Sequence, residues 1–121
     1  TVHACTDVTG FSLLGHAREM ADGSGTTAEI FADRTPLFDA ALSLARMGMI
    51  PAGAYRNREF LKDKILFDEM PLELTDVLFD PQTSGGLLIA LPETEAAKID
   101  APIIGQILPR GEKSIRVRKS A

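Results

Sequence analysis

The sequence predicts an α+β fold, in which a mixed β-sheet of about four to five strands carries helices mainly on one face. Segments with apolar residues at helical spacing share the chain with short runs of β-forming residues, and turn residues separate the two kinds of segment. The chain has 121 residues, of which 45% are hydrophobic and 25% are charged. A chain of this length and composition is expected to form one domain with its own core.

The first long element is expected to be a helix over residues 9–22, after a strand tail at the beginning of the chain. Leu13, Ala17 and Met20 fall on one face of such a helix. The turn-forming sequence of residues 22–25, DGSG, is expected to end it.

A strand and a second helix are expected to follow. Residues 26–32 alternate in the manner of a strand, and Phe31 on the otherwise polar side suggests that both faces are covered. Thr35 is the candidate N-cap of the next helix, Pro36 suits its first position, and Gly48 is its expected end. Residues 50–55, which contain a proline and a glycine, predict a loop.

The second half of the chain predicts three short helices and three strands. The helices are expected over residues 57–63, 71–78 and 92–98, and the strands over residues 87–91, 103–108 and 114–118. Residues 87–91 are continuously apolar, as expected of a central strand. Residues 114–118 alternate between polar and apolar, as expected of a half-buried edge strand.

Charge and cysteine content limit the classes of partner. A net charge of −4 argues against nucleic acid as the main partner, because neutralising phosphates needs a basic face. The basic residues near the C-terminus are expected to form a solvated strand edge and tail. A lone cysteine suits the reducing cytoplasm, and the apolar runs are too short to cross a membrane.

Residues 6–16 place Asp7, two hydroxyl groups and Gly10 at the mouth of the first predicted helix. Helix N-termini attract anions, and a carboxylate beside one can hold Mg²⁺ together with substrate phosphates. These residues therefore predict half of a metal–phosphate site. The alternative is that Asp7 serves only as an N-cap or a first-turn acid.

Residues 83–86, TSGG, predict a second anion-binding element. Hydroxyl groups followed by two glycines can present backbone N–H groups as an anion-binding nest. The alternative is a tight turn that leads into the following strand. Neither of the usual glycine-rich nucleotide-binding motifs is present in the sequence.

Cys5 and the two histidines offer further candidates. A nucleophilic Cys5 would need a base such as His3 or His16, and the three together would give an incomplete zinc site. Cys5 is instead expected to be a small packing residue, and His16 a structural hydrogen-bonding histidine.

Two long segments together resemble one family. Residues 3–16, HACTDVTGFSLLGH, closely resemble a signature of selenophosphate synthetase (selenide, water dikinase), and residues 79–88, FDPQTSGGLL, resemble its second signature. Residues 55–57, YRN, also resemble the family pattern. The resemblance covers essentially all of residues 1–121 and implies a single domain. By this resemblance, that domain is expected to be the C-terminal one of a two-domain enzyme, with a fold like the C-terminal domain of aminoimidazole ribonucleotide synthetase.

The resemblance implies the conversion of ATP, selenide and water to selenophosphate, AMP and phosphate, with Mg²⁺ required. Asp7 matches the metal-binding aspartate of this half, and Thr9, Gly10, Gly85 and Gly86 are the expected nucleotide-binding residues. The reactive cysteine or selenocysteine, the key lysine and the other metal ligands belong to the N-terminal domain. No catalytic residue is therefore expected in this chain, which should be inactive alone, and the full-length protein is expected to form a homodimer.

The chain departs from the family pattern in two places. Ser12 stands where the family usually has glycine, and residues 92–102 are short for the usual helix. Two alternative functions remain open on the sequence: a domain of another ATP-dependent synthetase or kinase of the superfamily, and a stand-alone phosphate- or metabolite-binding module.

Overall fold

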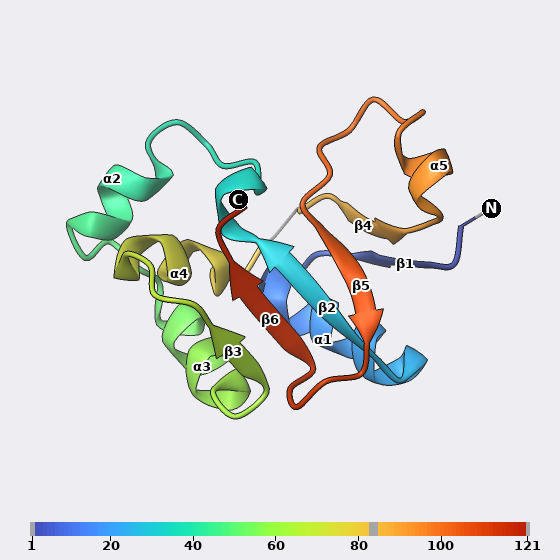
Figure 1. The fold of residues 1–121 in the computed structure, drawn as a ribbon. Coiled ribbons are helices and arrows are strands. Elements are labelled where there is room, and N and C mark those ends of the chain that lie inside the picture. Colours follow the sequence, from blue (N-terminus) through green and yellow to red (C-terminus); the bar gives the residue numbers. More distant parts are fainter. Residues whose placement is uncertain (1, 83–84, 121) are drawn as a thin grey trace.

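The computed structural model, which describes residues 2–82 and 85–120, is an α+β fold (Figure 1). The strands are β1 (Ala4–Asp7), β2 (Thr26–Phe31), β3 (Ile65–Phe67), β4 (Leu87–Ala90), β5 (Gly105–Pro109) and β6 (Ile115–Arg118). The helices are α1 (Ser12–Ser24), α2 (Ala41–Arg46), α3 (Ala52–Leu61), α4 (Leu72–Leu78) and α5 (Glu93–Ala96), with a 3₁₀ turn, η1, at Ala32–Arg34. Within the described ranges, no helix has the length and apolar character that crossing a bilayer requires.

A four-stranded mixed sheet is the main β-structure, in the order β3-β6-β2-β5. Strand β6 runs parallel to both β3 and β2, whereas β5 runs antiparallel to β2. The predicted mixed sheet is therefore confirmed, but β6 is an interior strand and the prediction of an edge strand is wrong. Its neighbour β3 was not predicted, because three residues are too few to show a periodic pattern.

Strands β1 and β4 form a separate two-stranded antiparallel ribbon. The prediction that residues 87–91 form a central strand is therefore wrong. Leu87 is 67% exposed and Ile89 is also exposed. A short apolar run does not by itself specify how many neighbours a strand will have.

The core lies between α1 and the four-stranded sheet, and Figure 1 shows α1 crossing behind β2 and β5. Leu14 and Ala17 of α1 belong to the same buried cluster as Ile30 and Val117 of the sheet. These sheet residues alternate with polar ones, as the spacing of residues 26–32 and 114–118 predicts.

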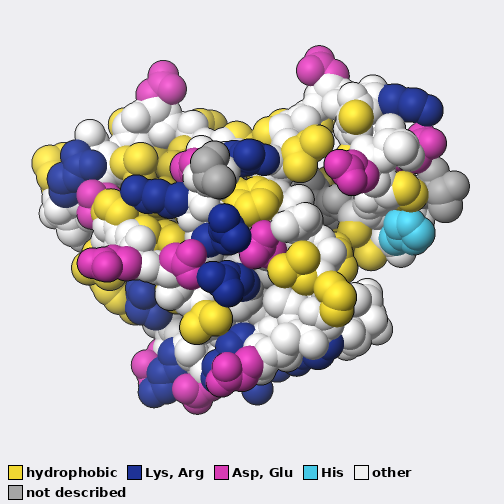
Figure 2. Space-filling model, viewed as in Figure 1, with side chains coloured by type: hydrophobic (Ala, Val, Ile, Leu, Met, Phe, Trp, Pro, Cys, Tyr) yellow, Lys and Arg dark blue, Asp and Glu magenta, His cyan; other side chains and the backbone are white. Residues whose placement is uncertain are grey.

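The opposite face of the sheet is charged, and Figure 2 shows basic and acidic side chains gathered over β6 and its neighbours. Glu29 is buried there, and it accepts a hydrogen bond of 2.7 Å from Gln106 Nε2. Arg116 and Arg118 each approach the Glu29 carboxylate to 3.8 Å. The basic residues of β6 thus lie on a sheet face rather than along a free edge.

The boundaries of α1, α2 and α3 differ from the expected ones. Helix α1 begins three residues later than expected, at Ser12, and α2 occupies only part of the segment between Pro36 and Gly48. Residues expected to form a loop include the first turns of α3, which begins after Pro51 at its N-cap position. Proline suits the start of a helix, so the same residue fits a helix start as well as a loop.

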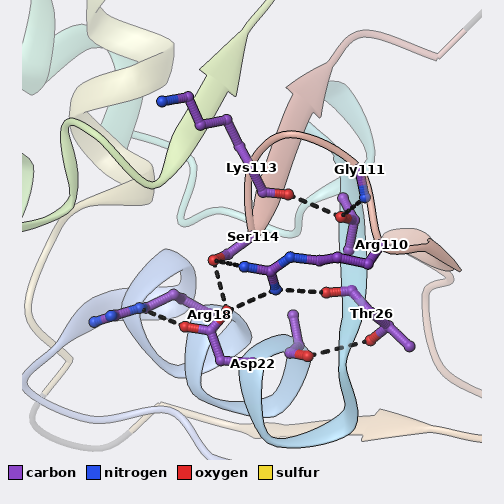
Figure 3. Close-up of polar contacts among 9 residues, drawn as sticks. Arg18, Asp22, Thr26, Arg110, Gly111, Lys113 and Ser114 are labelled. Carbon is purple, nitrogen blue, oxygen red and sulfur yellow. Dashed lines mark hydrogen bonds and ion pairs between the residues drawn. The ribbon is translucent and has the colours of Figure 1, made fainter.

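The C-terminal end of α1 is tied to the turn between β5 and β6 (Figure 3). The Asp22 carboxylate accepts hydrogen bonds from Ser114 Oγ at 2.6 Å, Arg110 Nη1 at 2.8 Å and Arg18 Nε at 2.9 Å. The Ser114 hydroxyl and then the Arg110 guanidinium lower the pKa of Asp22 to about 2. Asp22 therefore connects elements that lie more than eighty residues apart.

Candidate metal and phosphate site

The first motif (residues 3–16) and the second motif (residues 79–88) lie side by side. Strand β1 pairs with β4 so that Asp7 is opposite Leu87. Just beyond the strands, the Val8 N–H donates to the Gly86 carbonyl at 2.9 Å, and the Gln82 N–H donates to the Thr9 carbonyl at 3.0 Å. Backbone hydrogen bonds thus join two segments that the sequence separates by about seventy residues.

Asp7 is the last residue of β1 and is exposed. Among the described residues, none forms an ion pair or a hydrogen bond with its carboxylate. Helix α1 begins after Phe11, has no side-chain cap and carries no acid in its first turn. The alternative interpretation of Asp7 as an N-cap or first-turn acid is therefore wrong, and so is its placement directly at the helix mouth.

The glycines of the two motifs differ in what surrounds them. A Cβ on Gly85 would lie 2.3 Å from the Val8 carbonyl oxygen, so the packing of the protein itself requires glycine there. No described atom lies within 4 Å of the Cβ positions of Gly10 and Gly86. The approach of a ligand at Gly10 and Gly86 remains a prediction.

Thr9 is engaged within the protein. Its Oγ1 lies 2.9 Å from His16 Nε2, and its carbonyl accepts the N–H groups of both Ser12 and Gln82. His16 is buried, and its Nδ1 lies 3.2 Å from Glu19 Oε1 without the angles of a hydrogen bond. His16 is thus a structural histidine, as predicted, and it orients the turn that follows Asp7.

Ser12 has a left-handed backbone conformation, with φ of 72°, and its side chain is buried. Glycine adopts this conformation at much lower cost than serine. The usual glycine of the family pattern at this position is thus explained by backbone conformation. The Ser12 hydroxyl accepts a long hydrogen bond of 3.4 Å from the Gly15 N–H.

Cys5 is exposed, so its prediction as a buried packing residue is wrong. It lies on β1 opposite Ile89, and alternate residues of this ribbon face outward. No group of three or more His, Cys, Asp or Glu side chains that could hold a metal occurs among the residues described. The structure therefore does not form the zinc site considered for His3, Cys5 and His16.

Two further polar residues near the motifs were not singled out by the sequence. Asn57 of α3 is buried and donates hydrogen bonds to carbonyl groups of both motifs. Asp80 accepts a hydrogen bond from Gln82 Nε2 at 2.9 Å, and partial burial raises the pKa of its carboxyl group. Both lie in segments that carry the family resemblance, and this resemblance is the only sequence signal that could have pointed to them.

Thr83 and Ser84 of the expected anion-binding nest lie outside the described residues.

An exposed aspartate at a strand end, held against a glycine-rich loop in a small α+β domain, defines a candidate metal–phosphate half-site. Residues 1–118 match the family described as AIR synthase related protein, C-terminal domain, and the chain belongs to this family. This agrees with the family relationship that the two motifs predict.

Several curated relatives carry the name selenide, water dikinase. The protein of Clostridium botulinum (strain Alaska E43 / Type E3) is 50% identical over 127 residues, covering 97% of this chain and 37% of the relative. That of Caldanaerobacter subterraneus subsp. tengcongensis is 47% identical, with the same coverage of 97% and 37%. Selenide, water dikinase 2 of Peptoclostridium acidaminophilum is 44% identical, covering 96% and 36%. The chain thus spans little more than a third of the length of these relatives.

Proposed function

We propose that this chain is the C-terminal domain of a selenophosphate synthetase. The enzyme would convert ATP, selenide and water to selenophosphate, AMP and phosphate. The proposal is supported by the name that relatives at 44–50% identity share and by the alignment of nearly the whole chain with them. It is also supported by the pairing of the two motifs in space.

The observation that carries the proposal is the position of Asp7 in the β1–β4 ribbon. Its carboxylate is exposed and, among the described residues, unpaired, and the ribbon holds it opposite Leu87, directly after the glycine pair. Among the residues described, no atom lies within 4 Å of the Cβ positions of Gly10 and Gly86. In this proposal a phosphate group lies between the two motifs, near the exposed Asp7 carboxylate and the backbone at Gly10 and Gly86.

The chemistry of Asp7 fits Mg²⁺. This cation prefers oxygen ligands and is usually held through one or two carboxylates together with substrate phosphates and water. A single aspartate from this chain would therefore be enough as its share of the Mg²⁺ ligands. When bound, Mg²⁺ would neutralise charge on the polyphosphate during phosphoryl transfer. In this proposal Asp7 binds the metal, and Thr9, Gly10, Gly85 and Gly86 form the backbone that faces the nucleotide.

The rest of the site is assigned to an N-terminal domain of the same polypeptide. That domain would supply the reactive cysteine or selenocysteine, the lysine and the other metal ligands, so residues 1–121 would contain no catalytic residue. The full-length protein would act in the cytoplasm as a homodimer. The 121-residue chain alone is expected to be inactive, and selenide-dependent AMP formation by it would contradict this part of the proposal.

The test uses the full-length protein and an acid-to-amide pair of variants. Asp7→Asn should lower selenide-dependent AMP formation at least about 100-fold at limiting Mg²⁺, because the metal loses a charged ligand. Asp39→Asn makes the same chemical change at an exposed position ahead of α2 and should leave the rate unchanged. Full activity of Asp7→Asn with an unchanged Mg²⁺ requirement would overturn the proposal.

The same assay separates the alternatives. ATP turnover that does not depend on selenide would indicate another synthetase or kinase of the superfamily. Tight binding of a phosphate compound by the 121-residue chain in calorimetry, without turnover in the full-length protein, would indicate a binding module.

A further inference from the structure

Asn57 lies in α3, outside both motifs, and its side chain is buried, with 9% of the residue exposed. Its Nδ2 atom donates one hydrogen bond to the Gly10 carbonyl at 3.0 Å and another to the Phe79 carbonyl at 2.9 Å. Both N–H groups of the amide are therefore used, one on each motif.

The two acceptors lie at the points where the motifs leave regular structure. Gly10 precedes the first turn of α1, and Phe79 follows the last turn of α4. Beyond Phe79 the chain reaches Gln82, which donates to the Thr9 carbonyl. Asn57 thus joins the same two segments as the backbone hydrogen bonds do, from a third element of the fold.

A purely structural role would be to hold α3 against α4, but other residues already do this. Arg58 Nη2 donates to Thr75 Oγ1 at 2.8 Å and to the Asp76 carboxylate at 2.5 Å. Its guanidinium also lies 4.6 Å from the centre of the Phe79 ring. What Asn57 adds to this contact is the hydrogen bond to Gly10.

The backbone of α3 also approaches the second motif closely. A Cβ on Gly53 would lie 2.9 Å from Pro81 Cγ. Helix α3 therefore lies against the second motif at Pro81 and reaches the first motif through Asn57, one helical turn further along.

We infer that Asn57 is a positioning residue, which sets the separation of the two motifs and thereby the position of Asp7 relative to Gly85 and Gly86. Its effect on metal use rests on the proposed function, whereas its effect on the two segments does not. Asn57 touches neither metal nor nucleotide in this inference, and acts through the Gly10 and Phe79 carbonyl groups.

The first arm of the test measures hydrogen exchange in the full-length protein and does not depend on activity. Asn57→Leu removes both donors while keeping the number and branching of the side-chain heavy atoms, and exchange of the Val8 and Gln82 amides should rise at least about tenfold. Ser114→Ala is the matched control, because it removes a buried hydrogen-bonding side chain at the other end of α1. The control should leave these two amides unchanged, and unchanged exchange in Asn57→Leu overturns the inference.

The second arm measures the Mg²⁺ concentration that gives half-maximal rate. This Mg²⁺ concentration should rise about tenfold in Asn57→Leu, because the variant loses a residue that orients a metal ligand. It should stay constant in Ser114→Ala. Asn57→Gln, which keeps the amide donors, should recover part of the loss. A parent enzyme without selenide-dependent activity would overturn the proposed function, while the exchange arm would still decide the role of Asn57.

Asn57→Ser covers the case in which Asn57→Leu does not fold. Its shorter side chain adds no bulk, and its hydroxyl does not reach either carbonyl group, so the same two amides should again exchange faster than in the parent protein. A uniform increase over the whole domain, with no excess at Val8 and Gln82, would show general destabilisation and would overturn the inference.

Discussion

The carbonyl oxygen of Val8 occupies the space next to Gly85, where a Cβ atom would lie only 2.3 Å from it. This approach accompanies the hydrogen bond from the Val8 N–H to Gly86 and keeps the first motif against the second. The glycine pair thus has two separate roles, because contact within the chain requires Gly85, whereas no described atom lies within 4 Å of the Cβ position of Gly86.

Gly85→Ala is therefore expected to destabilise the protein, since the methyl group and the Val8 carbonyl cannot both keep their positions. We expect a loss of at least about 2 kcal/mol in the free energy of unfolding, measured by urea denaturation. Gly86→Ala is the matched control and should cost well under half as much. Equal stability of the two variants would contradict the packing argument.

Ser12→Gly is expected to stabilise the protein. The left-handed backbone at Ser12 costs about 1–2 kcal/mol for a residue with a Cβ, and the greater freedom of glycine in the unfolded chain offsets about half of this. A net gain of about 0.5–1 kcal/mol should appear as a higher melting temperature.

The control for this prediction is Ser24→Gly, at the end of α1, where the backbone is helical. Glycine there should lower stability by about 0.5 kcal/mol or less, because its helix propensity is below that of serine. A melting temperature that falls in both variants would contradict the assignment of strain to Ser12.

Asp22→Asn is expected to lower stability in a pH-dependent way. The pKa of Asp22 is about 2 in the folded protein, below the ordinary value of 3.8. The ionised carboxylate therefore stabilises the fold above about pH 4, and this contribution is lost as the pH falls towards 2. Because the side chain is about one-third exposed, solvent screening reduces the expected contribution to about 1 kcal/mol.

Urea denaturation of the parent protein and Asp22→Asn at pH 7 and at pH 2.5 checks this prediction. The difference between the two proteins should be largest at pH 7 and should shrink at pH 2.5. Ser120→Ala, which removes a hydrogen bond to the exposed Asp33, provides a comparison in which little change in stability is expected. A difference between parent and Asp22→Asn that grows at low pH would contradict the assigned pKa.

Parts of the fold could be predicted because their signals are local. The apolar spacing of Leu13 and Ala17 predicts α1, and the alternation of residues 26–32 and 114–118 predicts two strands of the sheet. Strand β3 could not be predicted, because it is too short to show alternation. The neighbours of β4 and β6 could not be predicted either, because strand pairing joins residues far apart in sequence and the pattern within one strand does not indicate its partners.

Some residues of the candidate site could likewise be predicted from the sequence, and others could not. The sequence singles out Asp7 and the glycines of the second motif, because a carboxylate can bind Mg²⁺ and glycines can present backbone N–H groups to an anion. It does not indicate the role of Asn57, since its acceptors are the carbonyl groups of Gly10 and Phe79 and every residue has a carbonyl group.

By itself, the sequence determined the α+β class, the family and the residues that are candidates for binding Mg²⁺ and phosphate. These properties depend on residue types at short spacing and on two motifs. Only the tertiary structure decided that Val8 excludes any side chain at Gly85, that Ser12 is left-handed and that Asn57 joins the motifs. Those facts depend on backbone geometry and on contacts between segments distant in sequence, which only the folded chain sets.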